Sequence, residues 1–411
     1  MRRFADGCKI KPPFKKKGGV PMRPCAAMCS FLPPHILRHL AENGDQAQRE
    51  DAYRSLETSS QIRGERLALG SAAALLAVPA GEKRRSVYDA HQARALPGTL
   101  IRSEGGPSNG DAAADEAYQG AGSTYDFFRK VYDRNSIDGR GIRLDSTVHY
   151  GVRFDNAQWN GRQMVYGDGD NRLFRRFTSC LEIIGHELTH GVTQYSAALE
   201  YADEPGALNE HFSDVFGVLV KQYALKQAAS KADWLVGAGL LTSKVHGMAI
   251  RSMKAPGTAY DDPLLGRDPQ PSHMRDFHHT HDDNGGVHIN SGIPNHVFYL
   301  VASRLGGKAW ETAGRIWYRT LTRKLHPRAQ FRDCAQGTAE VASELFGAGS
   351  EPQRVIEQAW LDVGVAAAPV MAGRSRSPRL SVRETYQPPT PAAEVPPSIS
   401  TSARRRRALS R

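Results

Sequence analysis

The chain has 411 residues, a formal net charge of +11 and five cysteines. Its length allows two lobes with appendages. The positive charge lies at the two ends, because residues 1–27 and 366–411 carry +7 each and leave −3 for residues 28–365. This distribution favours solvated basic ends over a nucleic-acid partner. No apolar run is long enough to cross a membrane, and the cysteine spacing shows neither a disulfide framework nor a four-cysteine zinc site.

The N-terminal part is predicted to hold a leader followed by a small helical segment. Residues 1–27 are rich in Lys, Pro and Gly and are predicted to be a disordered basic leader. The opening MRRF has no apolar core behind it, so no Sec-type signal is predicted. From Cys29 on, CSFLPPHILRHLAENG predicts a helix that begins after Pro-Pro and ends at Asn-Gly. Helical sequence continues to about residue 66, and an Ala/Gly/Pro junction follows near 70–82.

The remaining chain is predicted to form two lobes and a tail. Residues 76–180 contain short runs between Gly and Asp turns, which are typical of a β-rich lobe. Residues 181–365 are predicted to be mainly helical. Residues 366–411 are rich in Pro, Ser and Arg and are predicted to be a disordered tail. The expected fold class is therefore α+β.

The strongest chemical signal is the predicted helix LEIIGHELTH. It places His186 and His190 one turn apart on one face, within reach of a single metal ion, with Glu187 between them. Nineteen residues separate His190 from Glu210, which lies in a second amphipathic segment, GALNEHFSDVFG. Two histidines and a glutamate around zinc leave a fourth position open, as hydrolytic sites do. Asp214 follows Glu210 by one helical turn.

From about Ala95 to Val365 the chain resembles the thermolysin-like zinc metallopeptidases, and its compact build is similar to the protealysin-type branch. The signatures that carry this resemblance are, in order, NAQWNGRQMVYGDGD, HELTHGVTQ, LEYADEPGALNEHFSDVFG, ADW, IRSM, DNGGVHINSGIPN and LDVGV. HExxH together with the nineteen-residue gap and NExxxxD is specific, and DNGGVHINSG adds to it. The resemblance implies a two-lobed fold with the zinc site between a β-rich N-terminal lobe and a mainly α-helical C-terminal lobe.

The residues and the resemblance together assign roles around one catalytic zinc ion. The expected zinc ligands are His186, His190 and Glu210, and Glu187 is the expected general base. Asn209 and Asp214 are expected to orient the histidines through their second ring nitrogens.

The resemblance also implies which residues bind the substrate. The oxyanion of the tetrahedral intermediate would be met by Tyr201 and His288, with Asp283 supporting His288. The substrate chain would lie along a strand edge. The residues expected to hold it are Asn156, Ala157 and Arg251. The pocket for the residue after the cut is expected to be apolar, with walls from Phe174, Ile183 and Ile250.

The resemblance implies a zinc-dependent neutral endopeptidase that cuts on the N-terminal side of bulky hydrophobic residues and is made as a zymogen. Residues 28–75 resemble the short propeptide of the protealysin-type branch. Within it, Cys29 is either a thiolate that covers the zinc or a small apolar side chain at a helix start. The expected partners are a peptide substrate and the propeptide, with no nucleic acid or membrane, and a monomer is expected. Secretion without a Sec signal is expected, with a cytoplasmic precursor as the alternative.

Two departures from the family pattern qualify this interpretation. Gln158 stands where the family usually has an aromatic residue before its Trp, yet the backbone contacts of the strand edge are expected to remain. At the positions of the family's double calcium site the chain has Lys221, Leu235 and Ala238, while Glu182 and Asp233 stay acidic. Because calcium needs 6–8 oxygen ligands, this site is predicted to be absent.

A catalytically idle fold that acts as a binding module remains the alternative function.

Overall fold

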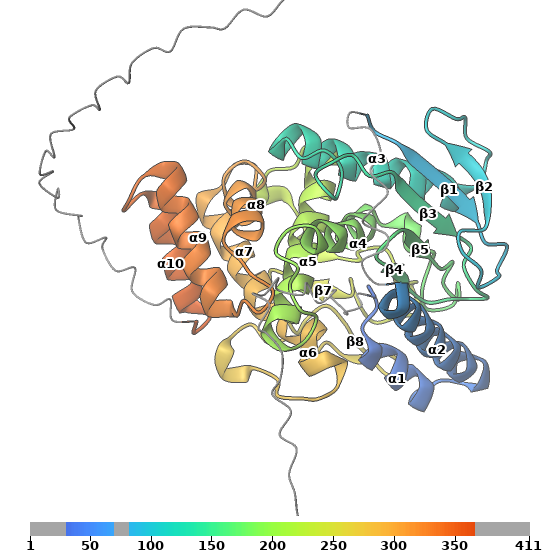
Figure 1. Ribbon diagram of the computed structural model, residues 1–411. Coiled ribbons are helices and arrows are strands. Elements are labelled where there is room, and N and C mark those ends of the chain that lie inside the picture. Colours follow the sequence, from blue (N-terminus) through green and yellow to red (C-terminus); the bar gives the residue numbers. More distant parts are fainter. Residues whose placement is uncertain (1–29, 70–81, 366–411) are drawn as a thin grey trace, which may run out of the picture. The chain divides into compact units, whose positions relative to one another are not determined.

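The structure is a computed structural model that describes residues 30–69 and 82–365, and for residues 63–69 it describes the backbone alone. Figure 1 shows a mixed sheet beside a group of helices, with two further helices from the start of the described chain. The predictions made for the leader 1–27, Cys29, the junction beyond Leu69 and the tail 366–411 lie outside the described residues.

A five-stranded mixed sheet forms the N-terminal part, in the spatial order β2-β1-β3-β5-β4. Its strands are β1 (Arg85–Asp89), β2 (Thr99–Ser103), β3 (Leu144–Val148), β4 (Ala157–Trp159) and β5 (Met164–Tyr166). The pairs β1–β3 and β3–β5 are parallel, whereas β1–β2 and β4–β5 are antiparallel. Strand β4 is therefore an edge strand, although all three of its residues are buried.

Three long helices connect the sheet to the rest of the chain. They are α3 (Ala112–Tyr132), α4 (Leu181–Gln194) and α5 (Asp203–Ala224). Asp111 caps α3, because its side chain accepts a hydrogen bond from the backbone amide of Ala114 at 2.8 Å. The prediction of a helix at LEIIGHELTH is confirmed by α4.

Two glycines let α4 and α5 pack unusually close together. A Cβ atom on Gly185 would come within 3.0 Å of the Cα atom of Gly217, and one on Gly217 would lie 2.4 Å from the carbonyl oxygen of Glu182. Larger residues at these two positions would push the helices apart. The close approach brings the histidines of α4 next to the carboxylate of Glu210 on α5.

The C-terminal part is mainly helical. Its helices are α6 (Asp283–Asn290), α7 (Gly292–Leu305), α8 (Ala313–Arg323), α9 (Phe331–Phe346) and α10 (Glu351–Asp362), with short 3-10 turns at Ala229–Lys231 and Met274–Asp276. A further 3-10 turn, Phe177–Ser179, lies just before α4. Two small antiparallel pairs join β6 (Leu235–Val236) to β7 (Arg251–Ser252) and β8 (Asp261–Asp262) to β9 (Gly266–Arg267). The prediction of an α+β fold with a sheet-containing N-terminal part and a helical C-terminal part is confirmed.

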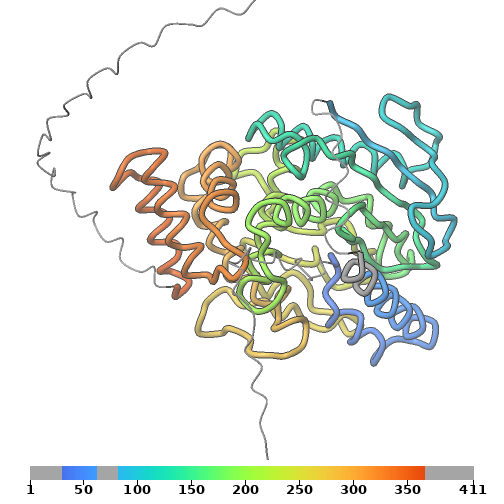
Figure 2. Tube along the Cα trace, viewed as in Figure 1, coloured from blue at the N-terminus to red at the C-terminus, as the bar shows by residue number. Residues whose placement is uncertain are grey.

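Helices α1 (Pro34–Asn43) and α2 (Gln46–Leu69) lie against both parts of the molecule. Figure 2 shows this blue segment beside green and yellow parts of the chain. On α1, His35 makes a hydrogen bond of 2.9 Å to the hydroxyl group of Tyr260. On α2, the hydroxyl group of Ser55 accepts from the amide of Asp155 at 3.0 Å, and Ser59 accepts from the side chain of Gln158 at 2.8 Å.

Helix α1 begins after Pro33 and ends before Gly44, as the sequence predicts. Its buried face consists of Ile36, Leu37, Leu40 and Ala41, which recur at helical spacing. Among the helices of residues 30–69 and 82–365, none has the length and apolar character needed to span a membrane.

Candidate active site

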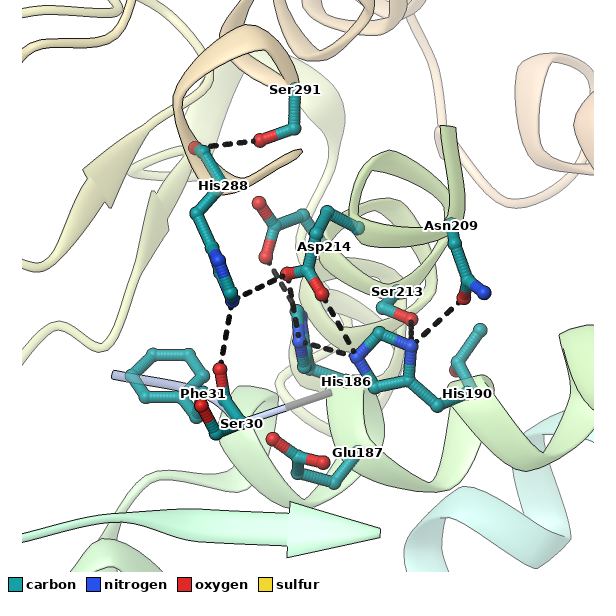
Figure 3. A network of polar contacts seen from close by, with 12 residues as sticks. Ser30, Phe31, His186, Glu187, His190, Asn209, Ser213, Asp214, His288 and Ser291 are labelled. Atoms are coloured by element: carbon teal, nitrogen blue, oxygen red, sulfur yellow. Dashed lines mark hydrogen bonds and ion pairs between the residues drawn. The ribbon is translucent and has the colours of Figure 1, made fainter. Parts of the chain in front are cut away.

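Helices α4 and α5 bring three potential metal ligands together in the buried interior (Figure 3). The Nε2 atoms of His186 and His190 lie 3.0 Å apart. They approach the carboxylate oxygens of Glu210 at 3.5 Å and 3.4 Å, respectively. All three residues are essentially inaccessible to solvent. Two imidazole nitrogens and a carboxylate oxygen that converge in this way match the donor set of a catalytic zinc site.

The second nitrogen of each histidine is held by a neighbour from α5. Nδ1 of His186 lies 2.8 Å from Asp214, and Nδ1 of His190 lies 2.9 Å from the amide oxygen of Asn209. Ser213 also contacts Nδ1 of His190, at 3.0 Å. These contacts leave Nε2 of both rings directed toward Glu210, which is the orientation that a shared metal ion requires.

Asp214 belongs to a fully buried ion pair. Arg251 donates two hydrogen bonds to its carboxylate, at 2.9 and 2.8 Å, and the side-chain amide of Asn295 donates a third at 2.8 Å. Burial opposes ionisation, but the guanidinium of Arg251 and the ring of His186 hold the pKa of Asp214 below its ordinary value. Asp214 therefore stays a carboxylate and keeps His186 in one orientation.

Glu187 points toward the sheet. Its Oε2 accepts a hydrogen bond from the backbone amide of Trp159 on β4, at 2.8 Å. Glu187 has a potential ligand atom within 4.8 Å of those of His186 and His190, so distance alone does not separate it from Glu210. Its link to β4, at the edge of the cleft, fits a general base better than a metal ligand. Glu210, in contrast, places its carboxylate oxygens 3.5 Å from Nε2 of His186 and 3.4 Å from Nε2 of His190, where a shared cation would lie.

A second polar group lies across from the histidines, on the turn that opens α6. Nδ1 of His288 is 2.7 Å from Asp283, and its Nε2 lies 3.3 Å from the hydroxyl group of Tyr201. Tyr201 in turn donates a short hydrogen bond to Glu210. Burial lowers the pKa of His288, but the charges of Asp283 and Glu210 outweigh burial and raise it to about 9. His288 is therefore a cation with a donor at Nε2 near neutral pH.

Residues 30–32 lie along β4 in the manner of an added strand. Ser30 forms an antiparallel bridge with Gln158, and the amide of Phe31 donates to the carbonyl of Ala157 at 3.0 Å. The amide of Leu32 donates to the side-chain oxygen of Asn156 at 2.8 Å. Gln158 therefore does not prevent this strand edge from making backbone contacts with residues 30–32.

The carbonyl groups of the same segment meet two of the charged side chains. The carbonyl oxygen of Ser30 lies 2.8 Å from Nε2 of His288, as Figure 3 shows. The carbonyl oxygen of Phe31 accepts from Arg251 at 3.1 Å.

The side chain of Phe31 fills an apolar pocket beside the histidines. Its ring centroid is 5.5 Å from that of His186 and 6.4 Å from that of Phe177, and it is fully buried. A Cβ atom on Gly237 would lie 3.1 Å from both Phe31 and Ile250, so this glycine shapes the pocket. Of the predicted walls, Ile250 lies next to Gly237, Phe174 lies one ring further out against Phe177, and Ile183 is buried in the same core cluster.

Several residues of the site were not predicted from the sequence: Ser213, Gly237, Asn295, Ser30 and Phe31. Ser213 and Asn295 carry no spacing signal of their own, because each reaches the site only through tertiary packing. Phe31 had a weak signal, since it is a bulky apolar residue immediately before the predicted helix of the propeptide segment.

Two family descriptions match most of the chain. Residues 54–194 match "Thermolysin metallopeptidase, catalytic domain", and residues 197–365 match "Thermolysin metallopeptidase, alpha-helical domain".

Individual relatives cover nearly the same span. An "Extracellular metalloprotease" of Pectobacterium carotovorum subsp. carotovorum is 51% identical over 339 residues, which are 82% of this chain and 96% of that protein. "Protease PrtS" of Photorhabdus sp. (strain Az29) is 45% identical over 341 residues, which are 82% of this chain and 91% of that protein. The solved precursor of protealysin, a metalloproteinase from Serratia proteamaculans, is 50% identical with a TM-score of 0.75, and the match covers 82% of this chain and 100% of that one.

The resemblance inferred from the sequence motifs is confirmed by these matches. The buried histidines of α4, with Glu187 between them, are the HExxH group that such an enzyme needs. The chain belongs to the thermolysin metallopeptidase family and is a zinc metalloendopeptidase of that family.

Proposed function

We propose that the enzyme hydrolyses peptide bonds on the N-terminal side of bulky hydrophobic residues. The observation that carries this proposal is the position of Phe31. Its ring fills the apolar pocket beside His186, while its backbone carbonyl is bound by Arg251. A substrate residue in the same place would contribute its buried apolar area to binding, which favours large aliphatic and aromatic side chains.

The catalytic roles follow from the same geometry. His186, His190 and Glu210 would hold the zinc ion, which when bound would supply a water molecule of lowered pKa and polarise the scissile carbonyl. Glu187 takes a proton from this water and passes it to the departing amine. Asn209 and Asp214 keep the two imidazole rings in place through their Nδ1 atoms.

Tyr201 and His288 stabilise the oxyanion that develops on the substrate carbonyl. Nε2 of His288 already donates to a carbonyl oxygen, that of Ser30. Asp283 holds the other ring nitrogen and keeps His288 protonated, so its donor is in place before the charge develops. The substrate backbone is held by Asn156 and Ala157 on one side of the cleft and by Arg251 on the other.

A cleavage profile tests this preference. We expect the enzyme, once freed from its N-terminal segment, to cut model peptides before Phe, Leu or Ile. The same peptides with Gly or Asp after the bond should be cut at least about tenfold more slowly, because the pocket then stays unfilled or buries a charge. Mass spectrometry of the products identifies the bond. Equal cleavage of both sets contradicts the proposed preference.

We also propose that the chain is made as a zymogen whose residues 28–75 form the propeptide. The support is that residues 30–32 fill the cleft, where a substrate would have to bind. The solved relative from Serratia proteamaculans is itself a precursor. The prediction that Cys29 covers the zinc falls outside the described residues and stays a prediction.

A buried carboxyl group lies where α2 docks on the catalytic part. Asp155 is fully buried, and neither of its oxygens has a hydrogen-bond partner among the described residues, although the backbone amide of Asp170 faces it. Burial raises the pKa of Asp155 well above its ordinary value, and the nearby charges of Asp170 and Asp51 add to this effect. A group with a raised pKa in the folded state stabilises it at low pH, and this contribution is lost as the pH rises.

We therefore expect Asp155→Asn to stabilise the precursor at pH 7–8 by about 1–3 kcal/mol, because the buried Asp must take up a proton at this pH whereas Asn needs none. The gain should shrink as the pH falls toward about 4, where a free Asp becomes protonated. Urea unfolding of both proteins across this pH range measures it. Asp170→Ala serves as a control and should destabilise, because Oδ1 of Asp170 accepts three backbone hydrogen bonds that Ala cannot accept. A gain that does not depend on pH argues against a buried proton on Asp155.

We propose that the enzyme lacks the double calcium site of larger family members. The ammonium group of Lys221 lies 3.3 Å from Glu182, 3.1 Å from Asp233 and 3.2 Å from the carbonyl oxygen of Leu235. A cation already neutralises these carboxylates, so calcium would meet repulsion and few free oxygens. Adding millimolar calcium to the chelator-treated protein should leave its melting temperature unchanged, whereas a rise of several degrees contradicts the proposal.

We place the activity outside the cell, because the 51% identical relative is described as extracellular. The expected partners are protein substrates and the enzyme's own propeptide.

A further inference from the structure

The peptide bond between Ser30 and Phe31 lies in the cleft in the position of a bond to be cut. Nε2 of His288, the donor assigned to the oxyanion, is 2.8 Å from the carbonyl oxygen of Ser30, before this bond. The next amide, that of Phe31, donates to Ala157 at 3.0 Å. The carbonyl group and the amide group of this bond are therefore both held by residues to which the proposed mechanism gives the role of binding substrate.

The contacts on the C-terminal side of the bond fix the same register. Arg251 binds the carbonyl oxygen of Phe31 at 3.1 Å, and Asn156 accepts from the next amide at 2.8 Å. The ring of Phe31 fills the pocket assigned to the residue after the cut. A segment that ran in the opposite direction, or that was shifted by one residue, would exchange donors for acceptors at these positions. The segment thus binds with the direction and register of a substrate.

We propose that the zinc-loaded precursor hydrolyses its own Ser30–Phe31 bond. This inference rests on the proposed endopeptidase function and adds a specific bond to it. Water adds to the carbonyl carbon of Ser30, and the bond from this carbon to the nitrogen of Phe31 breaks. Glu187 transfers the proton to that nitrogen, so the products are a carboxylate on Ser30 and a new amino terminus on Phe31.

The cut does not by itself open the cleft, because the chain after Phe31 is anchored elsewhere. His35 is hydrogen-bonded to Tyr260, Ser55 to the amide of Asp155, and Ser59 to Gln158. Helices α1 and α2 also bury apolar side chains against the catalytic part. The product beginning at Phe31 therefore remains docked, and full activation requires a second cut after α2.

The test follows the full-length precursor by intact mass and N-terminal sequencing after zinc is added to the chelator-treated protein. We expect a species that begins at Phe31 and has lost residues 1–30. Its rate of formation should not depend on protein concentration, because the reaction is intramolecular. The Glu187→Gln precursor should stay intact under the same conditions, which separates this cut from contaminating proteases.

Variants at the bond test the register. Phe31→Leu keeps a bulky apolar side chain and should still be cut at the same bond. Phe31→Ala should be cut about 10- to 100-fold more slowly, because it buries much less apolar area in the pocket. Equal rates for Leu and Ala, or cutting at a neighbouring bond, would overturn the proposed register.

A last measurement separates the failure of this inference from failure of the proposed function. The precursor is treated with trypsin, for which Lys83 and Arg84 offer sites before β1, and the product is assayed on a Phe-containing peptide. If this product cuts the peptide while the zinc-loaded precursor never shows a terminus at Phe31, the inference is wrong and the endopeptidase function stands. If the product is inactive as well, the proposed function fails with it.

Discussion

Replacing Glu187 by Gln is expected to lower kcat/KM for peptide hydrolysis by about 10²- to 10⁴-fold, the usual contribution of a general base. Gln has nearly the same shape and keeps a side-chain oxygen that can accept from the amide of Trp159, which Glu187 contacts at 2.8 Å. The metal ligands are unchanged, so the variant should bind zinc as the unmodified enzyme does. Steady-state kinetics on the freed enzyme and metal analysis of the same sample measure the two quantities.

Glu182→Gln provides a matched control on the same helix. Glu182 is also buried, but its carboxylate pairs with Lys221 and accepts from the amide of Ala238, away from the histidines. We expect this variant to lose stability and to keep its kcat. If Glu187→Gln retains full hydrolysis, another residue is the base. If neither the unmodified enzyme nor the variant hydrolyses peptides while a binding activity survives, the alternative of an idle binding module is favoured.

The zinc-site residues on α4 and α5 are the part of the molecule best predicted from the sequence. Within one helix, a spacing of four residues fixes which side chains share a face, so His186 and His190 are paired by local geometry alone. The same reasoning relates Asp214 to Glu210. The distance between the two helices could not be predicted in this way, because it depends on the small residues Gly185 and Gly217 where the helices cross.

The contacts of the propeptide segment show where sequence reasoning ends. The segment that opens with CSFLPP was predicted to be a propeptide with a helix after Pro-Pro, and the structure has a helix that begins at Pro34. Beyond its bulk and its place before the predicted helix, nothing in the sequence indicated that Phe31 would enter the pocket, because this contact joins residues more than two hundred positions apart, such as Phe31 and Arg251. Pairings of this kind depend on the complete tertiary structure, whereas helix periodicity does not.

The same limit applies to the hydrogen bonds around Asp214. The contact of Asp214 with His186 was predicted, but the hydrogen bond that Asp214 accepts from the side-chain amide of Asn295 was not. Asn295 passes the network on to His211, which contacts the indole of Trp317 at 2.8 Å. Each of these residues could be an ordinary buried polar residue. Only the folded structure shows that their hydrogen bonds form a chain that reaches the expected zinc ligand His186.

Replacing Arg251 by Met is expected to destabilise the precursor by about 3–5 kcal/mol, the usual cost of removing one member of a buried ion pair. The carboxylate of Asp214 would lose two of its hydrogen bonds and stay buried beside His186. Urea unfolding measures the loss. Adding Asp214→Asn to the Arg251→Met variant should recover part of it, because the buried charge is then removed.

Arg304→Met is the matched control, since Arg304 forms an ion pair of 2.5 Å with Asp362 at a largely exposed position. This change should cost no more than about 1 kcal/mol, as is usual for surface pairs. Equal effects of the two substitutions would show that the Arg251–Asp214 pair contributes no more than a surface contact. A larger loss for Arg251→Met, as we expect, would show that a substrate-binding residue also stabilises the fold, because Arg251 binds the carbonyl group of Phe31, the residue that fills the pocket.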